Sequence, residues 1–416
     1  MTFCSTNNLN YKFLNFISIL CACLVPLLVT GPFLPNVLVS SLSIWFLYYS
    51  LRNKIYTIYK NIYFYAFIAF CSVIIISSLL SDEIFVSLKS SLFYVRIGVF
   101  ALLISYLIRQ NKKILDYFYY SFIFTFSALI IDGYTQFLTG SNLLGYKLQG
   151  FRVSSFFNDE LILGSYLSRL FPLFFALYIL RVKKNIFDTY LIFIIFILID
   201  VLIFISGERT SLLFLNLSTI FLIFFLNKYK KFRIISFLVS IIIICFLLVT
   251  QNYHEHYIKR TLNETGINLN QNEFKKNEQL YIFSSSYDSH YKTAINMFLD
   301  KPIIGHGPNL FRVKCYDYKE GVAPCSTHPH NFYIQLLAET GIIGFAFLFG
   351  FLIYFIHLII KHARQSSVAK KFSDYQICIF SGVLIFLFPF SPNGNFFGSH
   401  LMYFYSLQFG FFFKKL

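Results

Sequence analysis

Long apolar runs separated by short polar connections make up most of this chain. Runs of a length suited to crossing a bilayer occur at twelve places. They lie at residues 13–31, 33–51, 62–80, 91–108, 114–138, 160–180, 186–205, 210–226, 233–250, 338–360, 375–390 and 399–413. The pattern predicts an all-α polytopic membrane protein with about twelve transmembrane helices, of which the two that meet near 206–211 could also form a re-entrant pair.

Composition and charge agree with this class. Hydrophobic residues make up 57% of the chain and charged residues only 13%, against about 25% charged in a soluble domain. The net charge of +16 would suit nucleic acid, but the basic residues gather in alternate connections. These are 52–60, 109–113, 181–184, 228–233, 361–371 and the tail 414–415.

By the positive-inside rule those connections, and both termini, are cytoplasmic. The charge is thus mainly a topology signal, with some affinity for anionic membrane lipids, and no nucleic-acid partner is expected. The predicted organisation is nine helices in 1–250, an extracytoplasmic loop subdomain in 251–337 and three helices in 338–416. Within the loop, the apolar face of 287–300 predicts a short amphipathic helix.

Cys315 and Cys325 are the only two cysteines of that loop. An extracytoplasmic loop is an oxidising setting, so we expect a disulfide between them, the alternative being two free thiols.

The loop ends in a dense polar stretch at the membrane boundary, where polar groups are costly and usually functional. It contains His328, His330 and Asn331, then Glu339 in a Glu-x-Gly-x-x-Gly sequence. The two histidines could chelate a metal, but the proline between them and the lack of a clear third ligand argue against it. We expect neither a metal nor another cofactor. Glu339 could orient a histidine or cap the local helix, and both interpretations stay open.

Arginines also lie at the predicted outer boundary. Arg209 follows Glu208 between two apolar runs, and its planar fork suits a phosphate or pyrophosphate. An ion pair with Glu208 or a snorkelling side chain is the structural alternative. Arg152 precedes another span on the same side and is a second candidate.

Three further charged residues, Arg96, Asp132 and Arg169, fall inside or near apolar runs. We expect them to pair with one another or to line a cavity, because an isolated charge there is costly.

The histidine stretch closely resembles the signature of the O-antigen ligase and polymerase superfamily, which is His-Asn, a Leu-rich turn and Glu-x-Gly-x-x-Gly. Other blocks resemble the family in the family's order and together span about 130–345. They are Asp132-Gly133-Tyr134 with Gln136 and Gly140, then 152–160, 207–210 and 300–308. The resemblance implies a C-type glycosyltransferase-like fold that transfers a glycan from a polyprenyl pyrophosphate on the outer face of the bacterial inner membrane.

The resemblance also implies roles for residues. His330 would be the catalytic histidine and Arg209 the first pyrophosphate arginine, with His328 as a supporting or acceptor-binding residue. Asn331 and Glu339 would support the site. The family often has an arginine at the start of the loop helix, where this chain has His290.

At that departure from the pattern, either Arg312 or Lys292 takes over the role of the arginine, or His290 binds phosphate itself. The chemistry suits these residue types, because cationic side chains stabilise a departing pyrophosphate and a histidine accepts the proton of the attacking hydroxyl. Such a direct displacement inverts the anomeric centre and needs no metal.

Three functions are consistent with these observations. A ligase would move an undecaprenyl-linked O-antigen onto a lipid A-core sugar, and this is the leading interpretation. A polymerase would use a second lipid-linked glycan as acceptor. A flippase or other transporter would explain the spans but not the polar outer loop, and no internal repeat supports it.

Overall fold

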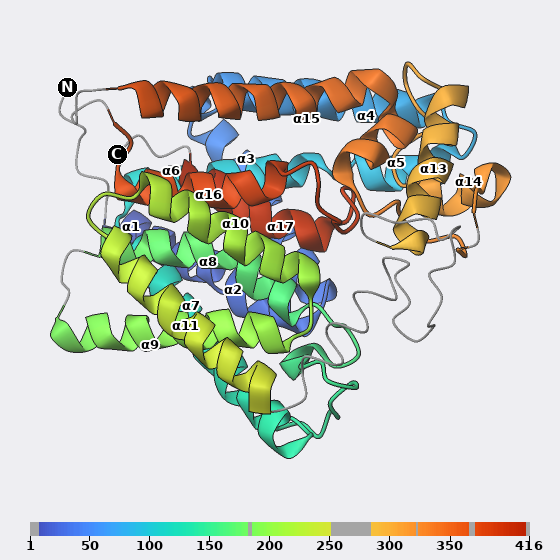
Figure 1. Cartoon of the computed structure of the whole chain (residues 1–416). Helices are drawn as coiled ribbons and strands as arrows, with labels where there is room; N and C mark the ends of the chain where they lie inside the picture. The colour runs from blue at the N-terminus through green and yellow to red at the C-terminus, as the bar shows by residue number, and fades with distance from the viewer. Residues whose placement is uncertain (1–7, 182–184, 251–283, 322, 366–370, 413–416) are drawn as a thin grey trace, which may run out of the picture.

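The computed structural model describes residues 8–181, 185–250, 284–321, 323–365 and 371–412, and these are folded almost entirely into helices (Figure 1). The first half contains α1 (Asn8–Ala22), α2 (Leu24–Leu27), α3 (Phe33–Arg52), α4 (Ile62–Leu79), α5 (Ile84–Ser91), α6 (Val95–Gln110), α7 (Lys113–Thr139), α8 (Leu163–Leu180) and α9 (Ile186–Ile205). The second half contains α10 (Arg209–Phe225), α11 (Lys230–Thr250), α13 (Ser285–Asp300), α14 (Phe311–Tyr318), α15 (Phe332–Arg364), α16 (Asp374–Leu387) and α17 (Ser399–Phe412).

The all-helical polytopic class predicted from the sequence is confirmed. Within the described residues, nine helical segments are long and apolar enough to cross a membrane, and each coincides with a predicted span. The other three predicted spans coincide with α10, α16 and α17, which have 17, 14 and 14 residues. The predicted loop helix is confirmed as α13, whereas the 251–283 part of the predicted loop lies outside the described residues.

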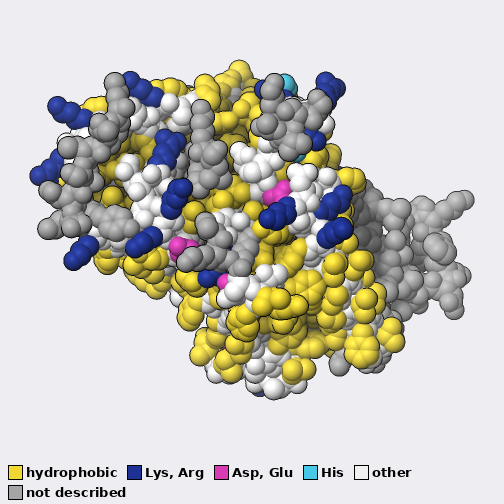
Figure 2. All heavy atoms as spheres, turned by 90° about the vertical axis from the view of Figure 1, so that its left-hand side faces the viewer, with side chains coloured by type: hydrophobic (Ala, Val, Ile, Leu, Met, Phe, Trp, Pro, Cys, Tyr) yellow, Lys and Arg dark blue, Asp and Glu magenta, His cyan; other side chains and the backbone are white. Residues whose placement is uncertain are grey.

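The long helices run side by side, with α5, α13 and α14 together at one end of the molecule (Figure 1). The opposite end carries a concentration of Lys and Arg side chains (Figure 2). Between the two ends, α8 is buried along most of its length and packs against α7, α9, α10 and α16. The core is therefore built around α8. The helices α13 and α14 lie at the end opposite the concentration of Lys and Arg.

One basic residue that we counted in a cytoplasmic connection lies inside the protein instead. Arg233 is fully buried and donates two hydrogen bonds to Asp200, at 2.7 and 3.1 Å, and one to Thr219 at 2.6 Å. Because a charge in the apolar core requires a partner, this pair ties α11 to α9 and α10. It is a structural ion pair and not part of the topology signal.

The predicted boundary at residue 338 falls inside a helix. The helix α15 begins at Phe332, and Asn331 caps it by accepting hydrogen bonds from the N–H groups of Tyr333 (3.0 Å) and Ile334 (3.2 Å). Gly341 interrupts α15 with φ +63° and ψ −166°, a conformation open essentially to glycine alone. Residues 332–337, Phe-Tyr-Ile-Gln-Leu-Leu, are mostly apolar and belong to the helix that the predicted boundary divides.

The backbone groups released by this break bond to the segment after α13. Carbonyls of Ala338 and Glu339 accept hydrogen bonds from the N–H groups of His306 (3.1 Å) and Gly307 (2.8 Å). In return, the N–H of Ile342 donates to the carbonyl of Pro302 at 2.8 Å. Buried backbone polar groups must be paired, so the break in α15 and the 302–307 segment depend on each other.

We therefore expect Gly341→Ala to destabilise the protein by about 2 kcal/mol or more, because a Cβ there would strain the backbone and overlap the carbonyl of Ile303. Gly350→Ala is the matched control on the same helix, where nothing lies within 4 Å of the added Cβ. It should stabilise the protein by up to about 1 kcal/mol. Thermal unfolding of the purified proteins in detergent measures both, and equal shifts for the two variants would contradict the role assigned to the break.

Candidate active site

The C-terminal end of α7 organises the loop that carries Arg152. Asp132 is fully buried and accepts hydrogen bonds from the hydroxyl of Ser155 (2.6 Å) and the side-chain amide of Asn142 (3.2 Å). Gln136, one turn further on, accepts from the backbone N–H of Ser155 at 2.7 Å. These bonds fold the loop after α7 back over the helix end, which fixes the position of Arg152.

Arg152 lies against the turn between α9 and α10. Its Nε donates to the carbonyl of Ser206 at 3.2 Å. Gly207 follows with φ +69°, and a Cβ at this position would lie 2.7 Å from Cγ of Arg152. Glycine thus permits the close approach, and Arg152 rests on the same turn from which Arg209 begins α10. Two arginines predicted as substrate contacts are brought to one place, although 57 positions separate them.

Glu208 fastens this turn to α8. Its carboxylate accepts hydrogen bonds from the N–H groups of Gly164 (2.6 Å) and Ser165 (3.1 Å), and from the hydroxyl of Ser211 (2.9 Å). Burial raises the pKa of Glu208 to about 7, while these hydrogen bonds and the charges of Arg152 and Arg169 act in the opposite direction. A carboxylate near the start of α8 satisfies N–H groups that have no partner within the helix.

A third arginine, Arg169, joins this group. It donates from Nη1 to Ser165, from Nε to the hydroxyl of Tyr405 at 2.9 Å, and from Nη2 to Oδ1 of Asn393 at 3.2 Å. All these partners are neutral.

The expectation that Arg96, Asp132 and Arg169 pair with one another is wrong. Arg96 donates to Asn36, Ser40 and Ser399, and Asp132 accepts from neutral donors of the following loop.

Asn393 connects the arginines to the histidine stretch. Its side chain accepts from Arg169, and its backbone N–H donates to the carbonyl of His330 at 2.7 Å. His330 has φ +61°, a rare conformation for a residue with a side chain, which is found preferentially at functional sites. The adjacent Asn331 donates to the carbonyl of Pro389 at 2.8 Å. The connection between α16 and α17 therefore holds His330 in place.

Three imidazoles meet at this point. The ring centroids of His328 and His330 are 4.1 Å apart, and those of His290 and His330 are 5.6 Å apart. Tyr287, also from α13, has its ring 5.2 Å from that of His330. The loop helix thus brings His290 to the histidine pair. No grouping suited to a metal ion is found among the described His, Cys, Asp and Glu side chains.

The environment favours the neutral form of both loop histidines. Burial lowers the pKa of His330 to about 3, and the neighbouring rings of His328 and His290 act in the same direction. Burial also lowers the pKa of His328 to about 4. Both rings are therefore neutral at pH 7, the form that accepts a proton. A bound anion would raise both pKa values by favouring the charged form.

The remaining candidates lie around this centre. Arg312 is exposed and donates to Asn309 at 2.7 Å, and its charge helps to lower the pKa of His328. Lys292 pairs with Asp288 at 3.0 Å. His290 is buried, and its Nε2 lies 3.0 Å from the carbonyl of Pro324.

Glu339 caps a helix, which is one of its two expected roles, but the helix is α14 and not its own. It caps α14 by accepting from the N–H of Phe311 at 2.8 Å, and it accepts from Gln335 at 2.9 Å. Gln335 in turn donates to Asn395 at 2.7 Å and accepts from the N–H of Phe396. Glu339 therefore supports the site through the α16–α17 connection, without orienting a histidine.

A disulfide closes the loop in front of the histidines. Cys315, in α14, is bonded to Cys325, three residues before His328, with their Cα atoms 5.8 Å apart. The approach to His328 and His330 is thereby tied to α14.

Residues 192–349 match the family model described as O-antigen ligase. Over these residues the chain is similar to that family. The family covers both ligases and polymerases of lipid-linked glycans. A search of curated proteins found no match.

The O-antigen ligase match includes Arg209, the loop histidines and the broken part of α15, but not Arg152, Arg169 or Asn393. The structure brings Arg152, Arg169 and Asn393 next to the matched segment. From the sequence, Arg169 is expected to pair with another charge or to line a cavity, and Asn393 is not singled out. One feature of the sequence could have indicated a role for Arg169. It is an arginine inside the predicted span 160–180, and it lies one helical turn after Ser165.

We expect Glu208→Gln to lower the free energy of unfolding by about 1–2 kcal/mol, because an amide nitrogen cannot accept one of the two backbone N–H groups. Glycan transfer should fall as well, since the turn bearing Arg209 loosens. Glu83→Gln is the control: Glu83 is exposed and makes no side-chain cap at α5. Thermal unfolding in detergent compares the variants, and an unchanged midpoint for Glu208→Gln would argue against its anchoring role.

Proposed function

We propose that this protein is an O-antigen ligase-type glycosyltransferase. It moves a polysaccharide from undecaprenyl pyrophosphate to a sugar of the lipid A-core. The observation that supports the proposal is the Arg169–Asn393–His330 connection, in which Asn393 is bonded both to the guanidinium of Arg169 and to the backbone carbonyl of His330. The family match supports transfer of a lipid-linked glycan.

In the proposed reaction, a hydroxyl oxygen of the acceptor sugar attacks the anomeric carbon of the donor. The bond between that carbon and the pyrophosphate oxygen breaks, and the electron pair leaves with the pyrophosphate. His330 accepts the hydroxyl proton, while Arg209, Arg152 and Arg169 stabilise the charge on the departing group. Attack from the opposite face inverts the anomeric centre. The arginines supply the positive charge, so no metal enters the scheme.

We further propose that both termini are cytoplasmic and that the site faces the periplasm. The concentration of Lys and Arg at the end opposite α13 and α14 supports this orientation (Figure 2). The disulfide between Cys315 and Cys325 also favours an oxidising compartment for the loop.

His330→Asn should lower transfer by about 100-fold or more, because the amide side chain cannot take up the proton. Asparagine tolerates the positive φ of this position, so the fold should be retained. His328→Ala should keep a measurable fraction of activity. His357→Ala, exposed on α15, is the control. The measurement is transfer from a lipid-linked donor in membranes, alongside thermal unfolding.

The pH profile adds a readout that a purely structural role would not affect. The low pKa of His330 predicts that kcat/KM stays constant down to below pH 6.5 and falls only as His330 becomes protonated. If His330→Asn keeps full activity, or if His328→Ala removes it instead, the acid–base assignment is wrong.

A lipopolysaccharide gel of a deletion strain tests the acceptor. A ligase predicts loss of all O-chain with accumulation of lipid-linked polymer. A core that bears a single repeat unit would instead identify a polymerase. Complementation with the native gene, and failure of complementation with His330→Asn, ties either phenotype to the site.

A further inference from the structure

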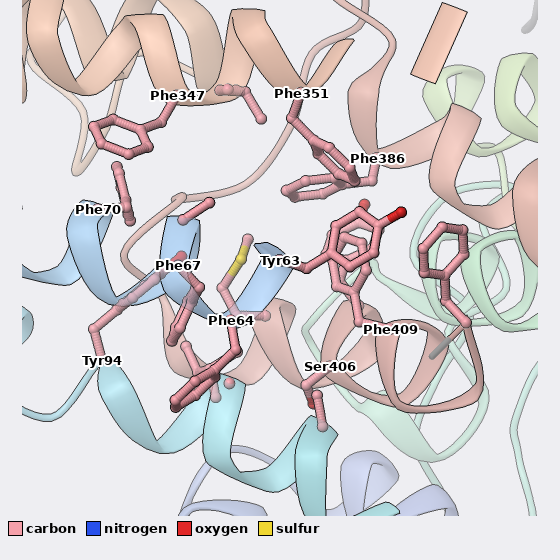
Figure 3. A pocket seen from close by; sticks show the side chains of 18 of the residues that line it. Tyr63, Phe64, Phe67, Phe70, Tyr94, Phe347, Phe351, Phe386, Ser406 and Phe409 are labelled. Atoms are coloured by element: carbon pink, nitrogen blue, oxygen red, sulfur yellow. The ribbon is translucent and has the colours of Figure 1, made fainter. Parts of the chain in front are cut away.

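A cavity of about 220 Å³ lies among α4, α6, α15, α16 and α17. Aromatic rings from four of these helices point into it: Phe67 and Phe70 from α4, Phe347 and Phe351 from α15, Phe386 from α16 and Phe409 from α17 (Figure 3). The lining is almost wholly apolar.

The few hydroxyl groups in the lining already have partners. Tyr63 is hydrogen-bonded to Tyr354 at 2.8 Å, and Tyr94 donates to the carbonyl of Phe396 at 3.3 Å. Ser406 donates to the carbonyl of Tyr403 at 2.9 Å. The walls therefore offer shape and apolar contact and little hydrogen bonding, which suits a hydrocarbon chain and disfavours a sugar or a phosphate.

The cavity exists because α15 stands away from the main bundle. Its principal contacts are with α4 and with the loop helices α13 and α14, and Figure 1 shows α4 and α15 together along one side of the molecule. Ala66 lines the cavity and is exposed on α4, and Tyr65 beside it is 55% exposed. Both lie in a segment suited to crossing the membrane. A chain can thus enter from the surrounding lipid.

Two lining residues connect the wall of the cavity to the candidate active site. The ring of Tyr405 forms part of the wall, and its hydroxyl accepts the hydrogen bond from Arg169. Phe396 also lines the cavity and lies three residues after Asn393, which is bonded to both Arg169 and His330. A molecule with a charged head at the arginines would have its apolar end beside this cavity.

We propose that this cavity holds a segment of the hydrocarbon chain of the lipid-linked donor, a long polyisoprenoid. This inference rests on the proposed function. The aromatic walls bind the chain, and the wall residues Tyr405 and Phe396 place its pyrophosphate end near Arg169 and His330. The enzyme then recognises its donor at two places, the charged head and a portion of the tail.

The test narrows the cavity without disturbing the site. Ala66→Phe adds a ring at the exposed edge of the cavity, whereas Ala69→Phe adds the same ring to the same helix at an exposed position outside the lining. Transfer is measured in detergent with two donors that carry the same glycan, one on a long polyprenyl pyrophosphate and one on a two-isoprene pyrophosphate.

For Ala66→Phe we expect KM for the long-chain donor to rise by about tenfold, because apolar contact is lost. The short-chain donor and the Ala69→Phe control should behave as the native protein does. Equal effects of Ala66→Phe on both donors, or none on either, would overturn the proposal. If the native protein transfers from neither donor, the proposed function fails instead.

Photocrosslinking provides an independent readout that does not require activity. A photoreactive polyprenyl phosphate in vesicles should label the part of α15 that contains Phe347 and Phe351, and Ala66→Phe should reduce this labelling. Excess unlabelled polyprenyl phosphate should compete. Labelling by a photoreactive phospholipid that polyprenyl phosphate does not displace would show that ordinary membrane lipid occupies the cavity, and would overturn the proposal.

Discussion

The break of α15 at Gly341 is the constraint on which the arrangement of α4, α15 and the loop helices depends. At a membrane boundary, backbone N–H and C=O groups that leave a helix must find partners within the protein. Here the 302–307 segment supplies them, and Ser77 from α4 donates to the carbonyl of Ile304 at 2.7 Å. One junction thus locks α4, α15 and the loop helices together. Before the break, this junction positions the start of α15 next to His330. After the break, it fixes the direction in which α15 runs, and this direction leaves space for the cavity.

Two buried arginines of the protein are held in different ways, and the difference suits the different roles that we assign to them. Arg233 is paired with Asp200, so its charge is cancelled within the apolar core and it serves to hold helices together. Arg169 is held by Ser165, Tyr405 and Asn393, all neutral. These partners fix its geometry without cancelling its charge, which also acts on the carboxylate of Glu208. In the proposed reaction this charge attracts the pyrophosphate of the donor.

Much of this architecture follows from local pattern. The lengths of the apolar runs predicted the positions of the long helices, and the amphipathic spacing of 287–300 predicted α13. Both patterns depend only on consecutive residues. The order of motifs pointed to Arg209 and His330. The pattern could not place Arg169 or Asn393, since their roles come from contacts between segments 224 positions apart. It also missed the burial of Arg233, since in sequence this arginine is indistinguishable from the lysines beside it. The cavity could not be predicted from the sequence, because each aromatic residue in its wall is, taken alone, typical of a membrane helix.

The α16–α17 connection is where these features meet. Asn393 contacts the carbonyl of His330 and the guanidinium of Arg169, and Asn395 and Phe396 are bonded to Gln335, which is bonded to Glu339. Phe396 then forms part of the cavity wall. A short segment outside the family match therefore touches the proposed base, a proposed pyrophosphate ligand and the proposed lipid site. If the donor lipid occupies the cavity, its binding bears directly on the segment that holds the catalytic histidine, which links recognition of the carrier to the chemistry at the sugar.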